Sequence, residues 1–463
     1  MLTSTSAEAA STDVQEEAYP PARYSWYVVA LLTLAYIFSF IDRQILSLLV
    51  VPIQRDLAVS DKQVSLLMGL TFAVFYTFFG IPLGRLADTW SRRWLVTLGI
   101  AFWSLMTAGC GLTRTFWQLA LARMGVGVGE ASLSPAAYSL IADYFPPERR
   151  STALGVYGMG IYIGSGLALI VGGLVVKFAS AQQDLVLPWV GAVRSWQLVF
   201  FAVGLPGLLI APLLLTIREP IRKGLRPKTA NAGATAKPSA SVGEVWSYLC
   251  QNRGTFFCLY FGCGLAALRA YGEMAWIPSF FMRRHGWSAG ETGVIYGLIV
   301  GVCGTAGMLA AGRLADLLRS RGHRDANVRV IMLSLVGWLP FGALYPLIPT
   351  GGWAAVMVAP AMFFGVMPFG LAPAAIQQLM PNVMRGQASA FYLFVVNLVG
   401  LGLGPTVIAT LTEDVFHDKN SIHLSLLVTG VVAQLLAAVL LWRGLKYFQR
   451  SLDYLKTWSQ SHG

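Results

Sequence analysis

Charged residues are scarce in this chain: Asp, Glu, Lys and Arg make up 12% of its 463 residues, whereas 56% are hydrophobic. A water-soluble domain usually carries about a quarter of its residues as these four types. Half that fraction is too small for a water-facing surface of this size and is typical of a surface that faces lipid. The 48 glycines and 22 prolines agree, because both are commoner in membrane helices than in soluble ones.

Cysteine and histidine are also few, with five of each. The cysteines lie in or beside apolar segments and show neither a paired disulfide framework nor the spacing of metal ligands. None of the histidines lies deep in an apolar run. We therefore expect no metal, no cofactor and no enzyme activity, and we interpret the cysteines as small packing residues.

Long apolar runs dominate the sequence. A bilayer core of ~30 Å requires roughly 20 apolar residues in a helix, and twelve runs reach that length. The expected fold is therefore an all-α membrane protein with twelve transmembrane helices. The predicted helices cover residues 27–51, 64–84, 94–113, 116–142, 151–177, 196–217, 253–282, 290–312, 328–348, 353–380, 386–412 and 421–443.

The basic residues indicate how these helices are oriented. With both termini placed in the cytoplasm, 23 of the 34 Lys and Arg residues fall in inner segments and 8 in outer loops, as the positive-inside rule requires. The net charge of +12 thus lies in short loops and does not indicate nucleic-acid binding. Because the chain also has no Asn-x-Ser/Thr acceptor, we expect it in the inner (plasma) membrane of a bacterial cell.

The chain is divided in the middle, and its two parts repeat each other. Residues 218–252 are basic and rich in Ala, Pro, Ser and Gly, which is typical of a flexible linker. GRLAD occurs at 84–88 and again at 312–316. Such duplication is typical of transporters, whose substrate site lies at the repeat interface. The predicted organisation is a disordered cytoplasmic tail (1–26), a six-helix bundle (27–217), a cytoplasmic linker (218–252), a second six-helix bundle (253–448) and a cytoplasmic tail (449–463).

These motifs resemble the major facilitator superfamily along essentially the whole chain. Residues 84–93, GRLADTWSRR, fit its signature between helices two and three, and 312–316 are a weaker second copy. Residues 123–131, RMGVGVGEA, resemble its fourth-helix motif. Ala168 and Leu169 stand where the superfamily's antiporter motif has Gly-Pro, so antiport is not implied.

Three further segments are similar to bacterial members of the Spinster-like group. They are FSFIDRQILSLLVVPI at 38–53, MGVGVGEAS at 124–132 and FPPERRSTALGVY at 145–157. That group is associated with proton-linked movement of lysophospholipids and sphingosine phosphates. The resemblance implies a proton-coupled transporter of an amphipathic, anionic lipid-like solute that works by alternating access.

A transporter of a small organic anion or sugar-like solute on the same fold is an alternative that the sequence leaves open. A channel is disfavoured, because no filter-like loop or pore ring is present. One chain contains both halves, so we expect a monomer. Its expected partners are the solute, protons and membrane lipid, with no nucleic acid.

Six charged residues lie well inside the predicted helices, away from their ends, where a charge is costly and marks a functional candidate. They are Asp42, Arg43, Arg123, Glu130, Arg269 and Glu273. Adjacent helical residues point ~100° apart, so we expect Asp42 and Arg43 to have different partners. Residues 123 and 130 are about two turns apart and share one helix face.

We hypothesise that Asp42 and Glu130 exchange protons, with Arg43 and Arg123 as charge partners or ligands of an anionic substrate. Burial favours the neutral carboxyl and a nearby arginine favours the charged form. A motion that changes their separation would therefore load and release a proton. The alternative is that these are static ion pairs that fix helix packing.

Two further sets of residues leave alternatives open. Arg269 and Glu273 are four residues apart, so they either contact substrate from the second half or neutralise each other. The resemblance also implies a cytoplasmic gate, in which an aspartate contacts a helix N-terminus and an arginine; the alternative is a set of solvated charges. The gate residues would be Gly84, Asp88, Arg92, Arg93, Arg150 and Asp316.

Overall fold

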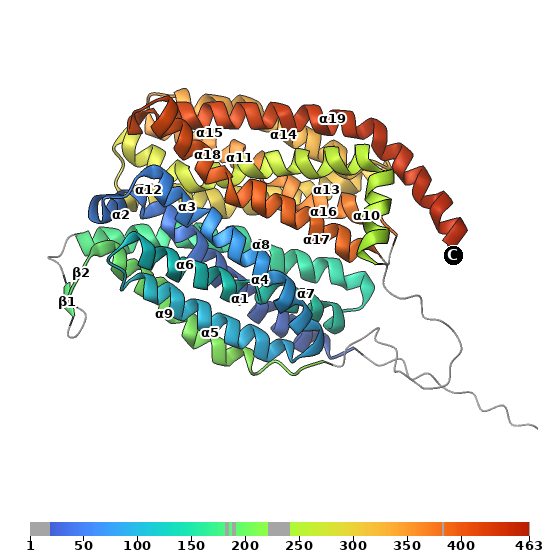
Figure 1. Ribbon diagram of the computed structural model, residues 1–463, viewed down its shortest axis with the longest axis horizontal. Helices are drawn as coiled ribbons and strands as arrows, with labels where there is room; N and C mark the ends of the chain where they lie inside the picture. The colour runs from blue at the N-terminus through green and yellow to red at the C-terminus, as the bar shows by residue number, and fades with distance from the viewer. Residues whose placement is uncertain (1–18, 181–184, 188–190, 221–240, 382–383, 463) are drawn as a thin grey trace, which may run out of the picture.

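The structure is a computed structural model that describes residues 19–180, 185–187, 191–220, 241–381 and 384–462. It is almost wholly helical, with one short antiparallel hairpin (Figure 1). In chain order the elements are α1 (Ala22–Leu48), α2 (Val50–Leu57), α3 (Asp61–Met68), α4 (Leu70–Thr89), α5 (Arg92–Cys110), α6 (Phe116–Glu130), α7 (Leu133–Tyr144), α8 (Pro147–Ser180), β1 (Leu185–Leu187), β2 (Gly191–Val193), α9 (Ser195–Leu214), α10 (Val242–Gln251), α11 (Arg253–His285), α12 (Ala289–Leu298), η1 (Ile299–Gly304), α13 (Thr305–Ser320), α14 (Ala326–Leu344), η2 (Tyr345–Leu347), α15 (Gly351–Gly365), α16 (Met367–Leu379), α17 (Arg385–Val395), η4 (Val396–Gly402), α18 (Gly404–Thr410), η5 (Leu411–Val415), η6 (Lys419–Ser421) and α19 (Ile422–His462).

Ten helical stretches among the described residues are long and apolar enough to cross a membrane. Two more long stretches, α6 with α7 and α11, run beside them. Both are more polar, because α6 carries Arg123 and Glu130 and α11 carries Arg269 and Glu273. Within the described residues, these twelve stretches confirm the predicted all-α fold.

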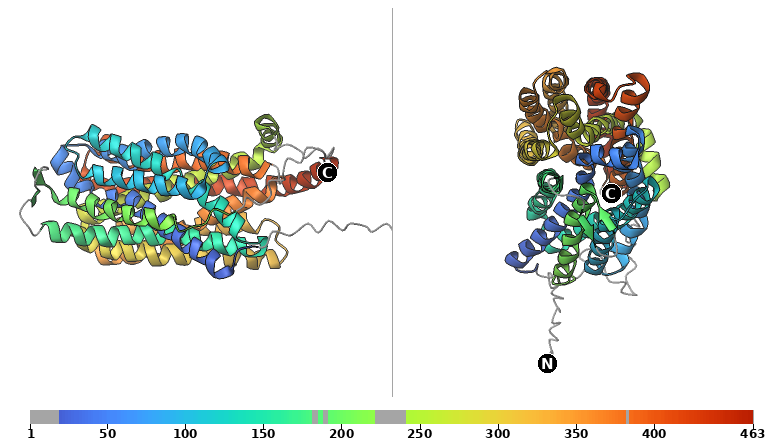
Figure 2. Two further views of the ribbon diagram at one scale, coloured as in Figure 1. Left: turned by 90° about the horizontal axis from the view of Figure 1, so that it is seen from below. Right: turned by 90° about the vertical axis from the view of Figure 1, so that its left-hand side faces the viewer.

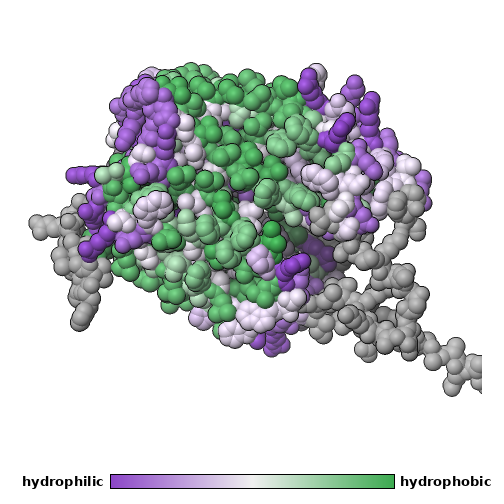
Figure 3. Space-filling view, viewed as in Figure 1, coloured by the Kyte–Doolittle hydropathy of each residue, from purple (hydrophilic) through white to green (hydrophobic). Residues whose placement is uncertain are grey.

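The helices form two bundles that lie side by side. Elements α1–α9 make up the first half and α11–α19 the second (Figures 1 and 2). Hydrophobic side chains cover the middle of the visible surface, and hydrophilic side chains gather at its two ends (Figure 3). We call the end where α1 begins and α19 finishes the termini end, and the opposite end the far end. The surface is that of a protein whose middle faces lipid.

The predicted linker and tails are more helical than their composition indicates. Helix α10 lies inside the range 218–252, and a capping box between Ser241 and Glu244 starts it. Tyr248 of this helix is buried and donates a 2.9 Å hydrogen bond to the Leu379 carbonyl of the second half. Likewise, α19 continues through most of the predicted tail 449–463. The predicted N-terminal tail up to residue 18 and the linker at 221–240 lie outside the described residues.

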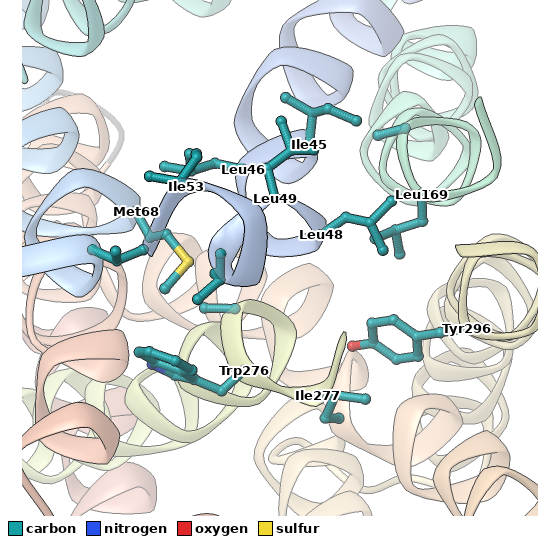
Figure 4. Packing of buried hydrophobic residues seen from close by; sticks show 14 of the residues in the cluster. Ile45, Leu46, Leu48, Leu49, Ile53, Met68, Leu169, Trp276, Ile277 and Tyr296 are labelled. Atoms are coloured by element: carbon teal, nitrogen blue, oxygen red, sulfur yellow. The ribbon is translucent and has the colours of Figure 1, made fainter. Parts of the chain in front are cut away.

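The hydrophobic core joins the two halves mainly at the far end. There, Leu48 and Leu49 of the first half belong to the same cluster as Trp276 and Ile277 of the second (Figure 4). Toward the termini end the buried residues divide into two clusters, each drawn almost wholly from one half. Apolar packing therefore closes the far end.

Helices α8 and α12 approach each other so closely that glycine is required between them. A Cβ atom added to Gly293 would lie 2.3 Å from the Leu169 carbonyl oxygen and 2.9 Å from the Gly173 Cα. Real Cβ atoms do not approach other heavy atoms so closely, and forcing a methyl group into such a contact typically costs about 1–3 kcal/mol.

We therefore expect Gly293→Ala to lower the stability of the protein by about 1–3 kcal/mol. Thermal unfolding in detergent measures this loss of stability. Gly312→Ala is the matched control, because nothing lies within 4 Å of a Cβ at that helical position. Equal melting temperatures for the two variants would contradict the expectation.

Candidate functional site

Two adjoining pockets lie between the halves and share Phe40, Tyr271 and Met274 in their walls. The space at the arginine pocket is about 500 Å³ and that at the apolar pocket about 680 Å³, open solvent at their mouths included. The other walls of the arginine pocket are Arg43, Gln44, Ser47, Met68, Phe72, Arg123, Ala275, Leu401 and Pro405. Those of the apolar pocket are Ile161, Tyr162, Arg269, Ala270, Glu273, Ile277, Tyr345, Val358, Ala361, Met362, Gly365, Val366 and Phe369.

An ion pair between α1 and α6 lies at the arginine pocket. Arg43 Nε lies 2.5 Å from Glu130 Oε2, and the Ser39 hydroxyl donates to the same oxygen at 2.6 Å. The Glu130 side chain is completely buried, whereas that of Arg43 is 15% exposed. The second carboxylate oxygen, Oε1, has no hydrogen-bond partner among the described residues. The arginine therefore faces the cavity, and the carboxylate lies behind it.

Aromatic rings surround the Arg43 guanidinium. Its central carbon lies 4.8 Å from the ring centre of Phe40 and 4.6 Å from those of Phe72 and Tyr76. Cation–π contacts of this kind hold a guanidinium in place while leaving its outer N–H groups available. Arg43 is thus positioned as a donor at the pocket wall.

Asp42 points away from both pockets. It is 1% exposed, and Thr107 and Trp103 of α5 flank its carboxylate. Arg123 Nη1 donates a 2.8 Å hydrogen bond to the Asp42 main-chain carbonyl and not to its carboxylate. The structure thus gives the adjacent residues Asp42 and Arg43 different surroundings, and Glu130 pairs with Arg43 rather than with Arg123 on its own helix.

Arg269 and Glu273 pair with each other in the wall of the apolar pocket. Their side chains are joined at 2.5 Å, one helical turn apart on α11. Arg269 also donates to the Gly365 carbonyl at 3.0 Å, and its guanidinium lies 4.6 Å from the Trp338 ring centre. The two residues therefore form an ion pair in this conformation, and because both also line the apolar pocket, their contact with substrate stays a prediction.

At the termini end, the gate residue Arg92 is the centre of a buried ion cluster. Its side chain is completely buried and is bonded to Asp143, and its Nε lies 2.7 Å from Glu219 Oε1. Glu219 also accepts a 3.1 Å hydrogen bond from the main-chain N–H of Arg93. The cluster fastens α5 to α7 and to the chain after α9, all within the first half.

The other predicted gate residues also lie at the termini end. Gly84 is half-buried, Asp88 is exposed, and exposed Asp316 pairs with Arg319 at 3.4 Å. Arg150 donates to a main-chain carbonyl of α7 at 2.9 Å. The Asp316 ion pair and the Arg150 hydrogen bond each join residues of a single half. The latch across the halves stays a prediction.

The Arg92 cluster predicts a pH-dependent stability. Burial raises the pKa of Glu219, but hydrogen bonds from Arg92, Arg93 and Ser91 outweigh it and hold that pKa below its usual value. A carboxylate with a depressed pKa stabilises the fold above its unfolded pKa of about 4.3, and this contribution is lost as the pH falls through the folded pKa.

We therefore expect Glu219→Gln to lower stability by about 1.5–3 kcal/mol between about pH 6 and 8, the usual worth of a hydrogen bond to a charged group. The difference from the wild type should shrink only below about pH 4. Denaturation measured across pH checks this. A difference that stays constant down to the lowest pH would show that the carboxylate charge is not involved.

A second cluster, which no sequence motif indicated, joins the two halves at the far end. Arg283 of α11 donates through Nη1 and Nη2 to the two carboxylate oxygens of Asp61 on α3, at 2.8 and 2.6 Å. Gln54 bonds both partners, donating to Asp61 at 2.6 Å and accepting from Arg283 at 2.9 Å. The Asp61 side chain is completely buried, and that of Arg283 is 9% exposed.

Two acidic residues of η5 add to this cluster. Glu413 accepts hydrogen bonds from the main-chain N–H groups of Asp61 and Lys62 at 2.5 and 3.4 Å, where the start of α3 favours a negative charge. Lys62 also pairs with Asp414 at 2.5 Å, with both side chains well exposed. Ionic contacts therefore join the two halves at the far end, where the apolar cluster also joins them.

Comparisons with known proteins agree with this architecture. Residues 32–405 match the profile of the Major Facilitator Superfamily. The "MFS-type efflux pump" of Mycolicibacterium smegmatis is 31% identical over 96% of this chain and 99% of that protein. The "Probable L-galactonate transporter" of Escherichia coli is 26% identical over 72% of this chain and 71% of that protein.

Spinster proteins appear in both the sequence and the structure comparisons. "Protein spinster homolog 1" of Bos taurus is 27% identical over 85% of this chain and 74% of that protein. The crystal structure of a bacterial homolog of the human lysosomal transporter Spinster, described as inward-facing and unoccupied, superimposes with a TM-score of 0.74 at 28% identity, over 94% of this chain and 99% of that one. The chain is therefore a Spinster-like member of the major facilitator superfamily of membrane transporters.

Proposed function

We propose that this transporter is proton-coupled and moves an amphipathic, anionic lipid-like solute by alternating access. The observation that carries the proposal is the Arg43–Glu130 pair, in which a cation faces the cavity and a buried carboxylate lies directly behind it. One pair thus contains both a donor for an anionic group and a group that can hold a proton.

The arginine pocket supports binding of an anionic head group. A planar guanidinium donates two parallel hydrogen bonds to a carboxylate or phosphate, which gives both strength and orientation. Arg43 can approach such a group from the pocket wall, and Arg123 adds a second positive charge in the same pocket. An anion bound to Arg43 would compete with Glu130 for it, so solute binding and protonation of Glu130 would favour each other.

The apolar pocket supports binding of an acyl chain. Its walls include Val358, Ala361, Met362, Val366 and Phe369. The two charged residues beside them, Arg269 and Glu273, neutralise each other. Because the two pockets share three residues, one molecule with an anionic head and an apolar tail can occupy both.

We further propose that the protein lies in a bacterial inner membrane with both termini in the cytoplasm. The excess of basic residues in the segments at the termini end supports this orientation. The far end, which apolar and ionic contacts close, then faces outward. The protein would act as a monomer in which the two halves rock against each other.

Transport of a small organic anion is the second candidate. The arginine pocket alone has the polar side chains of Gln44 and Ser47 beside its two arginines, and such a polar wall suits a sugar acid better than an acyl chain. The name of the Escherichia coli relative points to a solute of that kind for that protein.

Uptake into proteoliposomes under a pH gradient tests these proposals. We expect transport of a labelled lysophospholipid, with Arg43→Gln reducing its apparent affinity by about tenfold or more, as loss of a charge-assisted hydrogen bond implies. Arg43→Lys should retain part of the apparent affinity for the lysophospholipid, because lysine keeps the positive charge. Transport of a labelled sugar acid without any of lysophospholipid would favour the second candidate, and an unchanged affinity in Arg43→Gln would refute the role of Arg43.

A further inference from the structure

The outer surface of α19 changes from apolar to basic near the termini end. Along most of the helix the large exposed side chains are apolar: Val428, Val432, Leu435, Leu436, Val439 and Trp442. Arg443, Lys446 and Arg450 follow them, and all three are exposed. Basic side chains replace apolar ones where a helix passes from the hydrocarbon core to the lipid head groups. This part of α19 therefore lies at the level of the head groups.

Helix α11 lies beside α19 at this level and runs in the opposite direction (Figure 1). A Cβ atom added to Gly254 of α11 would lie 3.1 Å from the Tyr447 ring of α19. One added to Gly444 of α19 would lie 3.0 Å from the Cβ atom of Cys258 on α11. Glycine at these two positions lets the helices touch along a shared seam.

Exposed residues of α11 lie directly on one side of this seam. Arg253 and Phe257 precede Gly254 and Cys258, which face α19. Phe261 is one turn further along, and its ring centre lies 4.8 Å from that of Phe257. The three exposed residues are each four positions apart and so share one helix face. Helix α11 thus presents a cation at the level of the head groups and two apolar rings deeper in the bilayer.

Exposed residues of α19 lie on the same side of the seam. Arg443 directly precedes Gly444, and Arg450 precedes Ser451, whose hydroxyl lies 2.7 Å from that of Thr255 on α11. In a pair of antiparallel helices, the residues that precede the contact positions of each helix fall on one common side. We call the exposed residues there the seam surface: Arg253, Phe257, Phe261, Arg443, Tyr447 and Arg450.

The three arginines of the seam surface form no ion pair with a carboxylate of the residues that the structure describes. Asp453 is the one acidic residue of α19 and follows Arg450 by three positions, yet it pairs with Arg324 at 3.5 Å. Arg329, at the same end of the second half, pairs with Asp325 at 2.7 Å. Three positive charges are thus gathered on one face without a counterion from the protein.

We propose that the seam surface binds an anionic phospholipid of the surrounding bilayer. Arg443 and Arg450 donate hydrogen bonds to its phosphate, which a guanidinium can bind through two parallel N–H groups. Its acyl chains lie along Phe257 and Phe261. The charged and apolar parts of the surface follow each other in the order of a lipid's head group and chains, whereas a soluble acidic partner would match the charged part alone.

This site is separate from the transport cavity. The seam surface lies on the outside of the second half and contributes no residue to the arginine pocket or to the apolar pocket. The proposal therefore goes beyond the proposed function and does not depend on which solute is transported.

Binding of lipid to the protein in detergent, measured by native mass spectrometry, tests the site. We expect dioleoyl phosphatidylglycerol to bind about tenfold or more tightly than dioleoyl phosphatidylcholine, which has the same chains but no net charge. Arg443→Gln/Arg450→Gln should weaken binding of phosphatidylglycerol by about tenfold or more, because each basic side chain near an anionic head group raises affinity by about fivefold. Wild-type affinity in this double variant would overturn the proposal.

Arg321→Gln/Lys456→Gln is the matched control, because it removes two exposed positive charges from the same end of the second half. Lys456 follows Arg450 by six positions, about 120° around α19, and so points away from the seam. We expect this control to bind phosphatidylglycerol as the wild type does. An equal loss in both double variants would show that net charge alone attracts the lipid, and the site would be refuted.

Two further measurements distinguish the seam surface from other anion sites. Glycerol 1-phosphate has the charged group without chains, and if it binds as tightly as the lipid, the surface is a site for free anions and the lipid proposal fails. Arg43→Gln should bind phosphatidylglycerol as the wild type does. If it loses the lipid while Arg443→Gln/Arg450→Gln keeps it, the lipid lies in the transport cavity and the proposal is overturned. If only the seam variant loses the lipid and the wild type transports no lysophospholipid, the seam site stands and the proposed solute is wrong.

Discussion

Replacing Glu130 with glutamine should abolish the accumulation of solute that a pH gradient drives. Glu130 is buried, and its Oε2 receives hydrogen bonds from Arg43 and Ser39. Glutamine keeps the size and a carbonyl acceptor but cannot bind or release a proton. A gradient of one pH unit, with one proton moved per solute, supports about a tenfold concentration ratio. The variant should therefore show a ratio of about one.

Exchange of solute without a gradient is the companion measurement, because it requires the conformational cycle but no net proton movement. We expect Glu130→Gln to retain exchange at a reduced rate. Glu273→Gln is the matched control, since it removes a buried, arginine-paired carboxylate from the second half. It should retain gradient-driven accumulation if proton coupling is concentrated in the first half.

The alternative that Glu130 and Asp42 are only packing residues has a different outcome. A static ion pair, once broken, lowers stability by several kcal/mol, but the protein that survives would still couple solute to protons. Full gradient-driven accumulation in both Glu130→Gln and Asp42→Asn would therefore refute the proton-coupling hypothesis, whatever their melting temperatures.

The helices could be predicted from the sequence, but the pairing of the buried charges could not. Hydropathy alone decides which segments cross a bilayer, and a charge inside such a segment is visible directly. Which residue pairs with which depends on the rotation of each helix, and packing sets that rotation. The sequence placed Arg123 and Glu130 on one helix face, yet Glu130 pairs with Arg43, 87 residues away. Asp42 pairs with neither arginine through its carboxylate, because it points toward α5.

The ionic cluster at the far end shows a different limit of what can be predicted from the sequence. Asp61 and Arg283 stand at the ends of helices, where charged residues usually face water, so nothing in the sequence distinguishes them. Their burial arises only when the two halves meet. Helix α10 is the opposite case, because Ser241 followed by Glu244 is a capping-box pattern that was visible in the sequence, within a segment whose composition predicts a linker.

Replacing Arg283 with glutamine should shift the protein toward a conformation in which the far end is open. The substitution leaves the Asp61 carboxylate buried without its charge partner, which typically costs about 3–5 kcal/mol. That cost falls on the present conformation alone if Asp61 becomes hydrated when the halves separate. A difference of about 3 kcal/mol changes the ratio of the two conformations by roughly 100-fold.

Spin labels on exposed far-end residues of the two halves, Trp117→Cys on α6 and Val415→Cys on η5, measure this separation. These labels are introduced in a variant without the native cysteines. We expect a longer distance population in Arg283→Gln than in its parent. Lys62→Gln is the matched control, because it removes an inter-half ion pair that is well exposed, and such pairs contribute about 0–1 kcal/mol.

The double variant Asp61→Asn/Arg283→Gln separates loss of attraction from the burial of an unpaired charge. If the unpaired carboxylate drives opening, removing it as well should return much of the population to the short distance, since two neutral amides are far less costly to bury than one carboxylate. If the double variant opens as far as Arg283→Gln, the attraction between Asp61 and Arg283 itself closes the far end. If Arg283→Gln has the same distances as its parent, the ion pair does not contribute to closure, and the apolar cluster around Leu48, Leu49 and Trp276 closes the far end together with the remaining contacts of η5.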